Sequence, residues 1–332
     1  MKIAIIGSGS WGTALGNVLA QNGHDALIWG KSLDEVVDIQ QYHLNETYFP
    51  GVKLCEDLRA TPTYNDILDA DIFLLAIPSI AIESVCQELD KHLDRPVIII
   101  NVAKGFHPVT HEYLMEVIER SISNDHLSAV VSLIGPSHAE EVVLNQLTTV
   151  NAVSSNEDAA RTVQEIFSND FFRVYRNDDV VGAQIGVAVK NVMALASGIA
   201  SGLGYGDNTR AALITRGLAE ITRYGLYFGG RMDTFLGLCG VGDLVVTATS
   251  QHSRNFQAGY DVGVNGSTSH FFDTNIKTVE GVAATKVVYE VAKEKGIDMP
   301  ITEQVYKVFY EGKDPRQAIV DLMNRELKHE TK

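Results

Sequence analysis

The sequence has few cysteines, fewer basic than acidic residues, and no uninterrupted apolar run of about twenty residues. Its three cysteines among 332 residues, Cys55, Cys86 and Cys239, lack CxxC or metal-ligand spacing, which suits a reducing compartment. Lys and Arg number 27 against 42 Asp and Glu, and the resulting field disfavours nucleic acid and anionic membranes as partners. Without a long apolar run or a basic-then-apolar leader, we expect no membrane insertion and a cytoplasmic location.

Several common catalytic motifs are also missing from the sequence. It contains no GxSxG nucleophile elbow, no HExxH metal motif and no Walker-type GxxxxGK[ST] loop. The ten histidines are scattered, and His138, the only one near a candidate site, is interpreted as a helix-surface residue. The composition, 45% hydrophobic and 21% charged, is that of a globular chain long enough for two domains.

The most informative stretch that is present is the glycine run GSGSWG, which contains Gly7, Gly9 and Gly12. A short β-branched run precedes it at 2–6, helical spacing follows over 11–22, and a second apolar run follows at 25–30. These segments predict a βαβ unit whose first turn carries the glycines, where a helix N-terminus can receive the phosphates of a dinucleotide. The alternative is a glycine-rich turn without a ligand.

The end of the second predicted strand bears on the choice between NADH and NADPH. An acidic residue there usually binds the ribose 2′-OH, but this chain has Gly30 and Lys31 and no carboxylate before Asp34 and Glu35. A lysine can pair with a 2′-phosphate, so we predict that NADPH is used at least as well as NADH. The alternative is that Lys31 is an ordinary solvated charge.

The order of the predicted elements indicates the fold class. Strand-like and helical patterns alternate through the first half, with buried strands expected near 71–77, 96–102, 129–134, 148–154 and 171–176. From about residue 181 only helical spacing is found. We therefore predict an α/β fold with an N-terminal Rossmann-type, doubly wound, mostly parallel sheet at 1–181. A C-terminal all-helical domain at 182–332 follows it.

Two polar segments follow predicted strands, where a ligand cleft would lie. Lys104 comes directly after a buried strand, and its alternative role is that of a surface lysine. Gly135 and Ser137 follow another strand, and Ser137 with Glu140 matches a capping box. A helix N-terminus at this position could also offer N–H groups to an anion.

The helical half contains a second group of candidate residues. Lys190 lies within a long apolar helix, where a lysine either faces water or is held by a partner, and could then act as a general acid or base. Asp243, between glycines, could orient such an ammonium group. Ser253, Arg254 and Asn255 predict a helix cap and first turn that could bind phosphate, the alternative being a plain capped helix.

Together these segments form a pattern with a known counterpart. The motifs are GSGSWGTALG, NVAKG, GPSHAEE, VAVKNVMALASG, GDNTRAALITRGLAE, GVGDLVVTATSQHSRN and a late VEGV followed by MPIT. Over nearly its whole length the sequence resembles bacterial NAD(P)-dependent sn-glycerol-3-phosphate dehydrogenases. The resemblance implies reversible reduction of dihydroxyacetone phosphate to sn-glycerol 3-phosphate with NADPH or NADH, feeding phospholipid synthesis.

The resemblance also implies roles for individual residues. Lys190 would be the proton donor and acceptor, assisted by Lys104 and Asp243. The implied cofactor contacts are Ser10, Trp11, Lys31, Tyr48, Lys104, Ala139, Arg254 and Glu280. The implied substrate contacts are Lys104, Gly135, Ser137, Lys190, Asp243, Thr247, Ser253, Arg254 and Asn255. The stretch 266–277 departs from the family pattern.

Two other kinds of protein share parts of this pattern. A related two-domain dehydrogenase, of the 3-hydroxyacyl-CoA or 6-phosphogluconate type, would have a similar sheet and helical domain, but the His–Glu pair of the former has no persuasive match here. A cofactor sensor without turnover would keep the glycine run but would not need Lys104, Lys190 and Asp243. The helical domain could also supply an apolar face for a homodimer.

Overall fold

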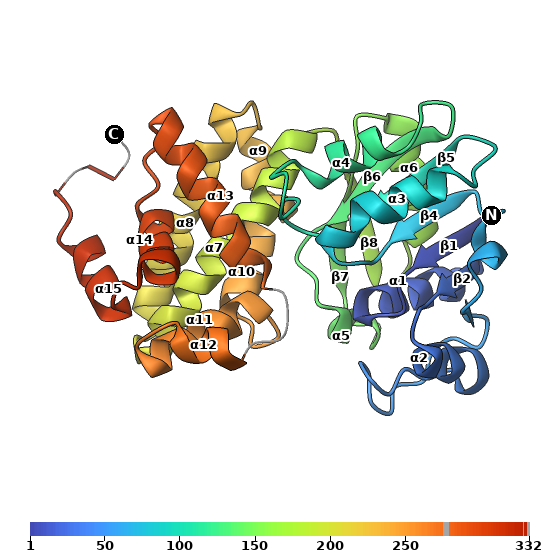
Figure 1. The fold of residues 1–332 in the computed structure, drawn as a ribbon, viewed down its shortest axis with the longest axis horizontal. Helices are drawn as coiled ribbons and strands as arrows, with labels where there is room; N and C mark the ends of the chain where they lie inside the picture. Colours follow the sequence, from blue (N-terminus) through green and yellow to red (C-terminus); the bar gives the residue numbers. More distant parts are fainter. Residues whose placement is uncertain (275–278, 328, 331–332) are drawn as a thin grey trace. The chain divides into compact units, whose positions relative to one another are not determined.

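The computed structural model describes residues 1–274, 279–327 and 329–330. The chain forms two units, Met1–Gln184 and Ile185–Lys332, with a sheet in the first and helices in the second (Figure 1). The predicted fold class is confirmed: the first unit contains a doubly wound, mostly parallel sheet, and the described part of the second is all helical apart from its connections.

The sheet of the first unit has eight strands in the order β3-β2-β1-β4-β5-β6-β7-β8. Only the β6–β7 pair is antiparallel among these neighbours. The chain reverses its direction of winding between β1 and β4, so the carboxyl ends of these strands are the expected ligand edge. The strands are β1 (Lys2–Ile6), β2 (Asp25–Trp29), β3 (Arg59–Thr61), β4 (Ile72–Leu75), β5 (Val97–Asn101), β6 (Leu127–Ile134), β7 (Thr148–Val153) and β8 (Phe172–Asn177).

Helices cover both faces of this sheet. On one face, α1 (Ser10–Gln21), α5 (Ala139–Val142) and α6 (Glu157–Phe167) share a core with inward residues such as Ile3 and Ile5. On the other face, α3 (Ile82–Asp90) and α4 (Leu114–Ser121) lie side by side and pack on residues such as Ile6 and Phe73 (Figure 1). The strands are therefore buried on both faces, which explains their continuous apolar runs.

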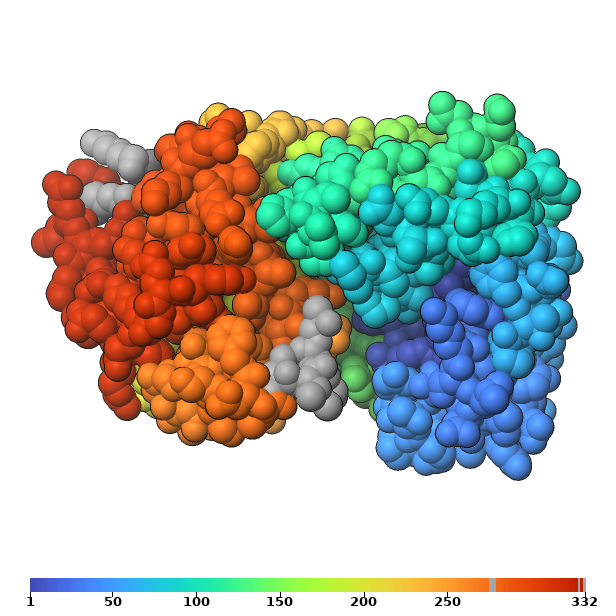
Figure 2. Space-filling model, in the orientation of Figure 1, coloured from blue at the N-terminus to red at the C-terminus, as the bar shows by residue number. Residues whose placement is uncertain are grey.

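The segment between β2 and β3 contains elements that the sequence pattern does not reveal. It carries α2 (Leu33–Val37) and a π turn, η1 (Asp38–Tyr42). Short 3₁₀ turns, η2 (Tyr64–Ile67) and η3 (Ser79–Ala81), precede β4 and α3. The blue residues of the α2 segment are at the surface of the first unit in Figure 2. At five and three residues, α2 and β3 are too short to show a helical or alternating period.

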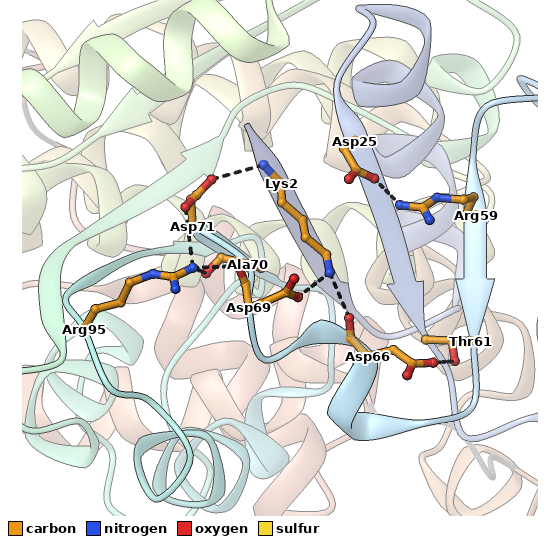
Figure 3. A network of polar contacts seen from close by, with 9 residues as sticks. All are labelled: Lys2, Asp25, Arg59, Thr61, Asp66, Asp69, Ala70, Asp71 and Arg95. Atoms are coloured by element: carbon orange, nitrogen blue, oxygen red, sulfur yellow. Dashed lines mark hydrogen bonds and ion pairs between the residues drawn. The ribbon is translucent and has the colours of Figure 1, made fainter.

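Charged side chains lie at the amino ends of the first three strands (Figure 3). Lys2, the first residue of β1, pairs with Asp69, and its ammonium also donates to the Asp66 carbonyl oxygen at 3.1 Å. Arg59 at the start of β3 pairs with Asp25 at the start of β2. These contacts are largely exposed to solvent, so each adds little to stability. They lie at the edge opposite to the glycine turn, which follows the carboxyl end of β1.

The second unit is assembled from helices. Its elements are α7 (Val180–Gly202, whose first residues belong to the first unit), α8 (Asp207–Tyr227), α9 (Met232–Phe235), a π turn η4 (Leu238–Gly242), α10 (Asp243–Thr249), α11 (Arg254–Asn265), α12 (Ser269–Thr274), α13 (Glu280–Lys295), α14 (Pro300–Glu311) and α15 (Pro315–Met323). Between Ile185 and Gly202, α7 is buried on nearly every side, so it is the central helix of this unit.

Glycines allow α7 and α11 to approach each other closely. A Cβ on Gly198 would lie 2.1 Å from the carbonyl oxygen of Phe256, and one on Gly202 would lie 2.3 Å from that of Tyr260. From the α11 side, a Cβ on Gly259 would lie 2.1 Å from the Leu195 carbonyl oxygen. The two backbones are therefore in contact along this crossing, which fixes the position of α11 and the residues at its first turn.

Two segments of the second half reach the length and apolarity of a membrane span by composition alone. In α7, 89% of the most apolar window is buried within the protein, so α7 is a core helix of this protein. The other segment, Met232–Thr249, is 44% buried and is divided into α9, η4 and α10. The absence of membrane insertion and the cytoplasmic location stay predictions.

Candidate functional site

Each glycine of the turn after β1 has a different environment. Gly7 has φ +118°, and a Cβ there would lie 2.4 Å from the Ala76 carbonyl oxygen. A Cβ on Gly12 would lie 1.9 Å from the Gly7 carbonyl oxygen, so both positions require glycine for packing. Within the part of the chain that the structure describes, a Cβ on Gly9 would find only the Tyr48 phenol within 4 Å, at 3.9 Å. The backbone at Gly9 is therefore open to a ligand, and no described side chain caps the helix that begins at Ser10.

A buried hydrogen-bond network, which sequence reasoning missed, shapes this turn. The Asn45 amide nitrogen donates to the Ser8 carbonyl oxygen at 3.0 Å and to the Thr13 hydroxyl at 2.9 Å. The Thr13 hydroxyl donates in turn to the same Ser8 carbonyl oxygen at 3.1 Å. Asn45 and Thr13 are fully buried. This network holds the turn in one conformation, which favours phosphate binding by backbone N–H groups at the start of α1.

Lys31 and Tyr48 lie on the surface of the segment that follows β2. The Lys31 ammonium is exposed and lies 5.9 Å from the centre of the Trp29 ring. Burial, together with the negative charge of Glu35, raises the pKa of the Tyr48 phenol above its usual value. Glu35 also accepts a hydrogen bond from the Ser8 hydroxyl. A carboxylate therefore lies beside the glycine turn, although the sequence shows none at the end of β2.

The loops after β5 and β6 bring Lys104, Gly135 and Ser137 together. The Lys104 ammonium donates to the Gly135 carbonyl oxygen at 3.3 Å, and the Ser137 hydroxyl donates to the same oxygen at 3.1 Å. The predicted capping box at Ser137 is wrong: α5 begins at Ala139 with His138 as its N-cap residue. Ser137 turns back to Gly135 instead, because its place is two residues before the helix. Ala139 is buried as the first residue of α5.

Lys190 is buried in the second unit and held by two side chains. Its ammonium lies 2.7 Å from Asp243 Oδ1 and donates to the Thr247 hydroxyl at 2.7 Å. The side chains of Lys190 and Asp243 are 3% and 0% exposed, so a position on the wet side of an amphipathic helix is excluded. The Thr247 hydroxyl donates to the Asp243 carbonyl oxygen at 2.6 Å, so the lone pairs of the hydroxyl oxygen face the lysine.

This arrangement depends on a close approach between α7 and the turn before α10. A Cβ on Gly186, one helical turn before Lys190, would lie 2.3 Å from the Cys239 carbonyl oxygen. A Cβ on Gly240 would lie 1.9 Å from the carbonyl oxygen of Phe235. Gly186 therefore allows α7 to pack against the turn, Gly240 allows the turn to fold back on Phe235, and Asp243 follows directly as the first residue of α10. The ion pair is compensated within the protein, as a buried charge must be.

The first turn of α11 contains the predicted Ser253, Arg254 and Asn255. The cap is confirmed, because the Ser253 hydroxyl accepts the Phe256 N–H at 3.2 Å. Arg254 is exposed as the first residue of the helix. The Asn255 side chain is buried, and its oxygen accepts the N–H of Gly281 at 2.8 Å. This bond joins the N-terminus of α11 to that of α13.

The predicted residues therefore fall into local groups within each unit. In the first unit, Gly9, Ser10 and Tyr48 lie at the glycine turn, while Lys104 and Ser137 share the Gly135 carbonyl oxygen. In the second unit, the structure joins Lys190, Asp243 and Thr247, and the remaining substrate candidates lie at the start of α11. The other predicted residues are placed on their elements: Trp11 on α1, Arg254 on α11 and Glu280 on α13.

The poorly matching stretch 266–277 is only partly within the described residues. Gly266 ends α11 with φ +67°, and α12 follows over Ser269–Thr274. The last three positions, 275–277, lie outside them. Glu280, the late cofactor contact that the resemblance implies, is the first residue of α13.

Comparison with known proteins agrees with these features in both units. Residues 2–160 match a family model described as NAD-dependent glycerol-3-phosphate dehydrogenase N-terminus, and residues 179–320 match the corresponding C-terminus model. The chain is 46% identical to "Glycerol-3-phosphate dehydrogenase [NAD(P)+]" of Staphylococcus haemolyticus, across 99% of both chains. It is 48% identical to the protein of that name from Geobacillus kaustophilus, over 99% of this chain and 96% of that one.

Solved structures give the same result. The crystal structure of glycerol-3-phosphate dehydrogenase from Coxiella burnetii superposes with a TM-score of 0.89 at 36% identity, covering 98% of this chain and 99% of that chain. Both halves of the chain, with their elements in the same order, therefore correspond to those of glycerol-3-phosphate dehydrogenases. The chain belongs to the NAD-dependent glycerol-3-phosphate dehydrogenase family.

Proposed function

We propose that this protein interconverts dihydroxyacetone phosphate and sn-glycerol 3-phosphate with a nicotinamide dinucleotide, and that Lys190 is its general acid and base. The family membership and the names of its relatives support the reaction. The observation that carries the role of Lys190 is its buried contact with Asp243 and Thr247. Burial keeps the ammonium group out of bulk water and fixes its direction, which a proton donor requires.

The residues of the glycine turn fit a dinucleotide. Gly9 has open space beside it, and the first turn of α1 carries N–H groups that no described side chain caps. When bound, the reduced nicotinamide supplies a hydride to the ketone carbon of the substrate. Lys190 gives its proton to the oxygen that becomes the alcohol, and takes a proton back in the reverse direction. Asp243 stabilises and orients the ammonium form of Lys190. Thr247 is bonded to both Lys190 and Asp243 and so fixes the distance between these two residues.

Several cationic and polar groups are available for the substrate phosphate. Arg254 at the first turn of α11 can present a guanidinium fork, beside the helix N–H groups. A cation at a helix N-terminus is unfavourable by itself, so its position there supports an anionic ligand. Lys104 and Ser137 are proposed as contacts from the loops of the first unit, where Lys104 adds positive charge near the reacting oxygen.

Two finer proposals concern the cofactor and the biological role. We propose that NADPH is used at least as well as NADH, because Lys31 follows β2 where the ribose 2′-position is expected. Steady-state kinetics with both cofactors test this, and a large preference for NADH would contradict it. We also propose that the product feeds glycerophospholipid synthesis, which depletion of the protein in its host, with and without added glycerol 3-phosphate, would test.

The decisive experiment for Lys190 follows oxidation of NADPH with dihydroxyacetone phosphate as substrate. We expect Lys190→Ala to lose at least ~100-fold in kcat, the lower end of what general acid–base catalysis contributes. Lys307→Ala, which removes a half-buried lysine of the same unit, is the matched control and should retain activity. Near-normal kcat in Lys190→Ala would remove Lys190 from the chemical step.

Folding and substrate controls complete this experiment. Removing Lys190 leaves Asp243 buried without this cation, so the circular dichroism spectrum of the variant must first match that of the parent. Thr247→Val retains the ion pair and should lose less activity than Lys190→Ala. Turnover with acetoacetyl-CoA instead of dihydroxyacetone phosphate would favour the hydroxyacyl-CoA type of dehydrogenase, and dinucleotide binding without turnover of either would favour a sensor.

A further inference from the structure

Glu35 is held at the glycine turn by a contact that spans 27 positions of the sequence. The Ser8 hydroxyl, buried in the turn after β1, donates to Glu35 Oε2. The Glu35 N–H is bound from the other side by the hydroxyl of Ser32, the N-cap residue of α2, at 3.4 Å. Backbone and side chain of Glu35 are thus both tethered, and its carboxylate has a defined position on the surface of this unit.

The same carboxylate influences Tyr48, the side chain that lies beside Gly9. Its charge contributes to the raised pKa of Tyr48, whose phenol oxygen lies 3.9 Å from the position of a Cβ on Gly9. On the β2 side, a Cβ on Gly30 would lie 2.5 Å from the Ser8 hydroxyl oxygen. Glu35 therefore lies where the turn after β1 meets the end of β2.

In a sheet of this order, that place receives the adenosine ribose of a dinucleotide. A carboxylate there accepts a hydrogen bond from a ribose 2′-OH and repels a 2′-phosphate. Lys31 acts in the opposite sense, from an exposed position beside the Trp29 ring. Glu35 is half-buried and hydrogen-bonded, so its charge has a fixed position and opposes the effect of Lys31.

We propose that Glu35 is a specificity-determining residue that opposes the 2′-phosphate of NADPH, so that cofactor choice reflects the balance between Lys31 and Glu35. This proposal rests on the use of a nicotinamide dinucleotide proposed above. It assigns to a helix residue six positions after the end of β2 the role that the end of the strand usually carries.

The test compares binding of 5′-AMP and adenosine 2′,5′-bisphosphate, which differ only in the 2′-phosphate, by calorimetry on the intact protein. We expect Glu35→Gln to increase the affinity for the bisphosphate about tenfold. This is the effect of removing one negative charge about 6 Å from a phosphate dianion in aqueous surroundings. Binding of 5′-AMP should change by less than about threefold, because glutamine still offers an oxygen to the 2′-OH.

Asp34→Asn is the matched control, since it makes the same charge change at an exposed neighbour in the same helix. It should shift either affinity by no more than about twofold, as expected for a screened surface charge. A Glu35→Gln effect equal to that of Asp34→Asn, or equal for the two nucleotides, would overturn the proposal. So would failure of the parent protein to bind either nucleotide.

Kinetics supply a second readout that a purely structural role of Glu35 would not move. The ratio of kcat/KM for NADPH to that for NADH should rise about tenfold in Glu35→Gln, mainly through the KM for NADPH. Ser8→Ala, which frees the carboxylate, should move the ratio in the same direction by less. Because the nucleotides bind without turnover, an inactive protein with the predicted binding shift would refute the proposed reaction but not the role of Glu35.

Discussion

At the scale of single residues, the buried lysine shows why charge placement matters more than charge number. The chain carries a net charge of −15, yet its proposed substrate and cofactor are anions. Attraction must therefore come from a few cations in fixed positions, such as Lys190 within its contacts to Asp243 and Thr247. Arg254 differs from Lys190 because it is exposed, so its proposed part is to bind rather than to transfer a proton.

This difference predicts distinct kinetics for Arg254→Ala. Loss of a charge-assisted contact to phosphate should raise the KM for dihydroxyacetone phosphate by about 10- to 100-fold, with a smaller change in kcat. Arg316→Ala is the matched control, because Arg316 is also an exposed arginine in the first turn of a helix of this unit. The test measures the KM for dihydroxyacetone phosphate in the parent, in Arg254→Ala and in Arg316→Ala. Equal KM values for the parent and Arg254→Ala would show that the guanidinium does not hold the phosphate.

At the scale of elements, the position of α11 follows from glycines rather than from side-chain interdigitation. Gly198 and Gly202 of α7 face Gly259 and Gly263 of α11 with backbone atoms in contact. The first turn of α11 carries Arg254 and Asn255, so the spacing between the helices determines where these residues lie.

We therefore predict that Gly259→Ala destabilises the protein. The methyl group would lie 2.1 Å from the Leu195 carbonyl oxygen, and neither backbone can move without separating the helices. Overpacking of this kind costs about 1–3 kcal/mol, which outweighs the ~1 kcal/mol that alanine gains over glycine in a helix interior. Urea unfolding measures the change. Gly206→Ala adds the same methyl group where no atom of the described residues lies within 4 Å, and a loss as large as that of Gly259→Ala would refute the argument.

How far the sequence predicts these elements depends on their length and on whether their contacts are local. β1, β5 and the cap at Ser253 were predictable, because an apolar run or a short spacing contains the whole signal. The sequence left open whether Lys190 is buried, because α7 is apolar on most sides, but it suggested Asp243, 53 positions away, as the group that orients the ammonium, and the structure shows this contact. The tether between Ser8 and Glu35 was missed, because no local pattern links residues 27 positions apart.

The wrong capping box at Ser137 has a related cause. A spacing of three residues fits a cap, and the strand was correctly predicted to end at residue 134, but the sequence does not show that a turn continues through His138 and that α5 begins only at Ala139. Within this turn the Ser137 hydroxyl donates to the Gly135 carbonyl oxygen instead of capping the helix. A local motif is therefore reliable only where the neighbouring elements leave its side chains unused.

At the scale of the whole molecule, the response of stability to pH depends on carboxylates of two kinds. Exposed acids held by cations, such as Glu112 beside Arg120, have a pKa below the usual value, in this case about 2. They stabilise the folded state at pH values above the ordinary pKa range of carboxylates. Glu220 of α8 is of the other kind: burial raises its pKa to about 7, against the opposing effect of its hydrogen bonds to Ile301 and Thr302.

The sign for Glu220 follows from where the proton binds. Because its folded pKa, about 7, exceeds the usual glutamate value of 4.5, the folded state holds a proton that the unfolded state has lost between these values. The contribution of Glu220 to the free energy of unfolding is therefore complete below pH 4.5 and is lost as pH rises to about 7. The shift corresponds to about 3 kcal/mol at most over this range.

Glu220→Gln removes the titration while keeping one carbonyl oxygen at the start of α14, so it tests this account. The variant should be less stable than the parent at low pH, because its amide group cannot accept both N–H donors, of Ile301 and Thr302. The difference should shrink by roughly 3 kcal/mol between about pH 4.5 and about pH 8, as measured by urea unfolding across the range. Glu303→Gln, which replaces a half-exposed acid on α14, controls for the charge change. Burial lowers the pKa of His24, but His24 is present in every protein compared, so its effect on stability cancels. Parallel stability curves for the parent and Glu220→Gln would mean that Glu220 stays ionised throughout, and that Arg223 and the helix N–H groups outweigh its burial.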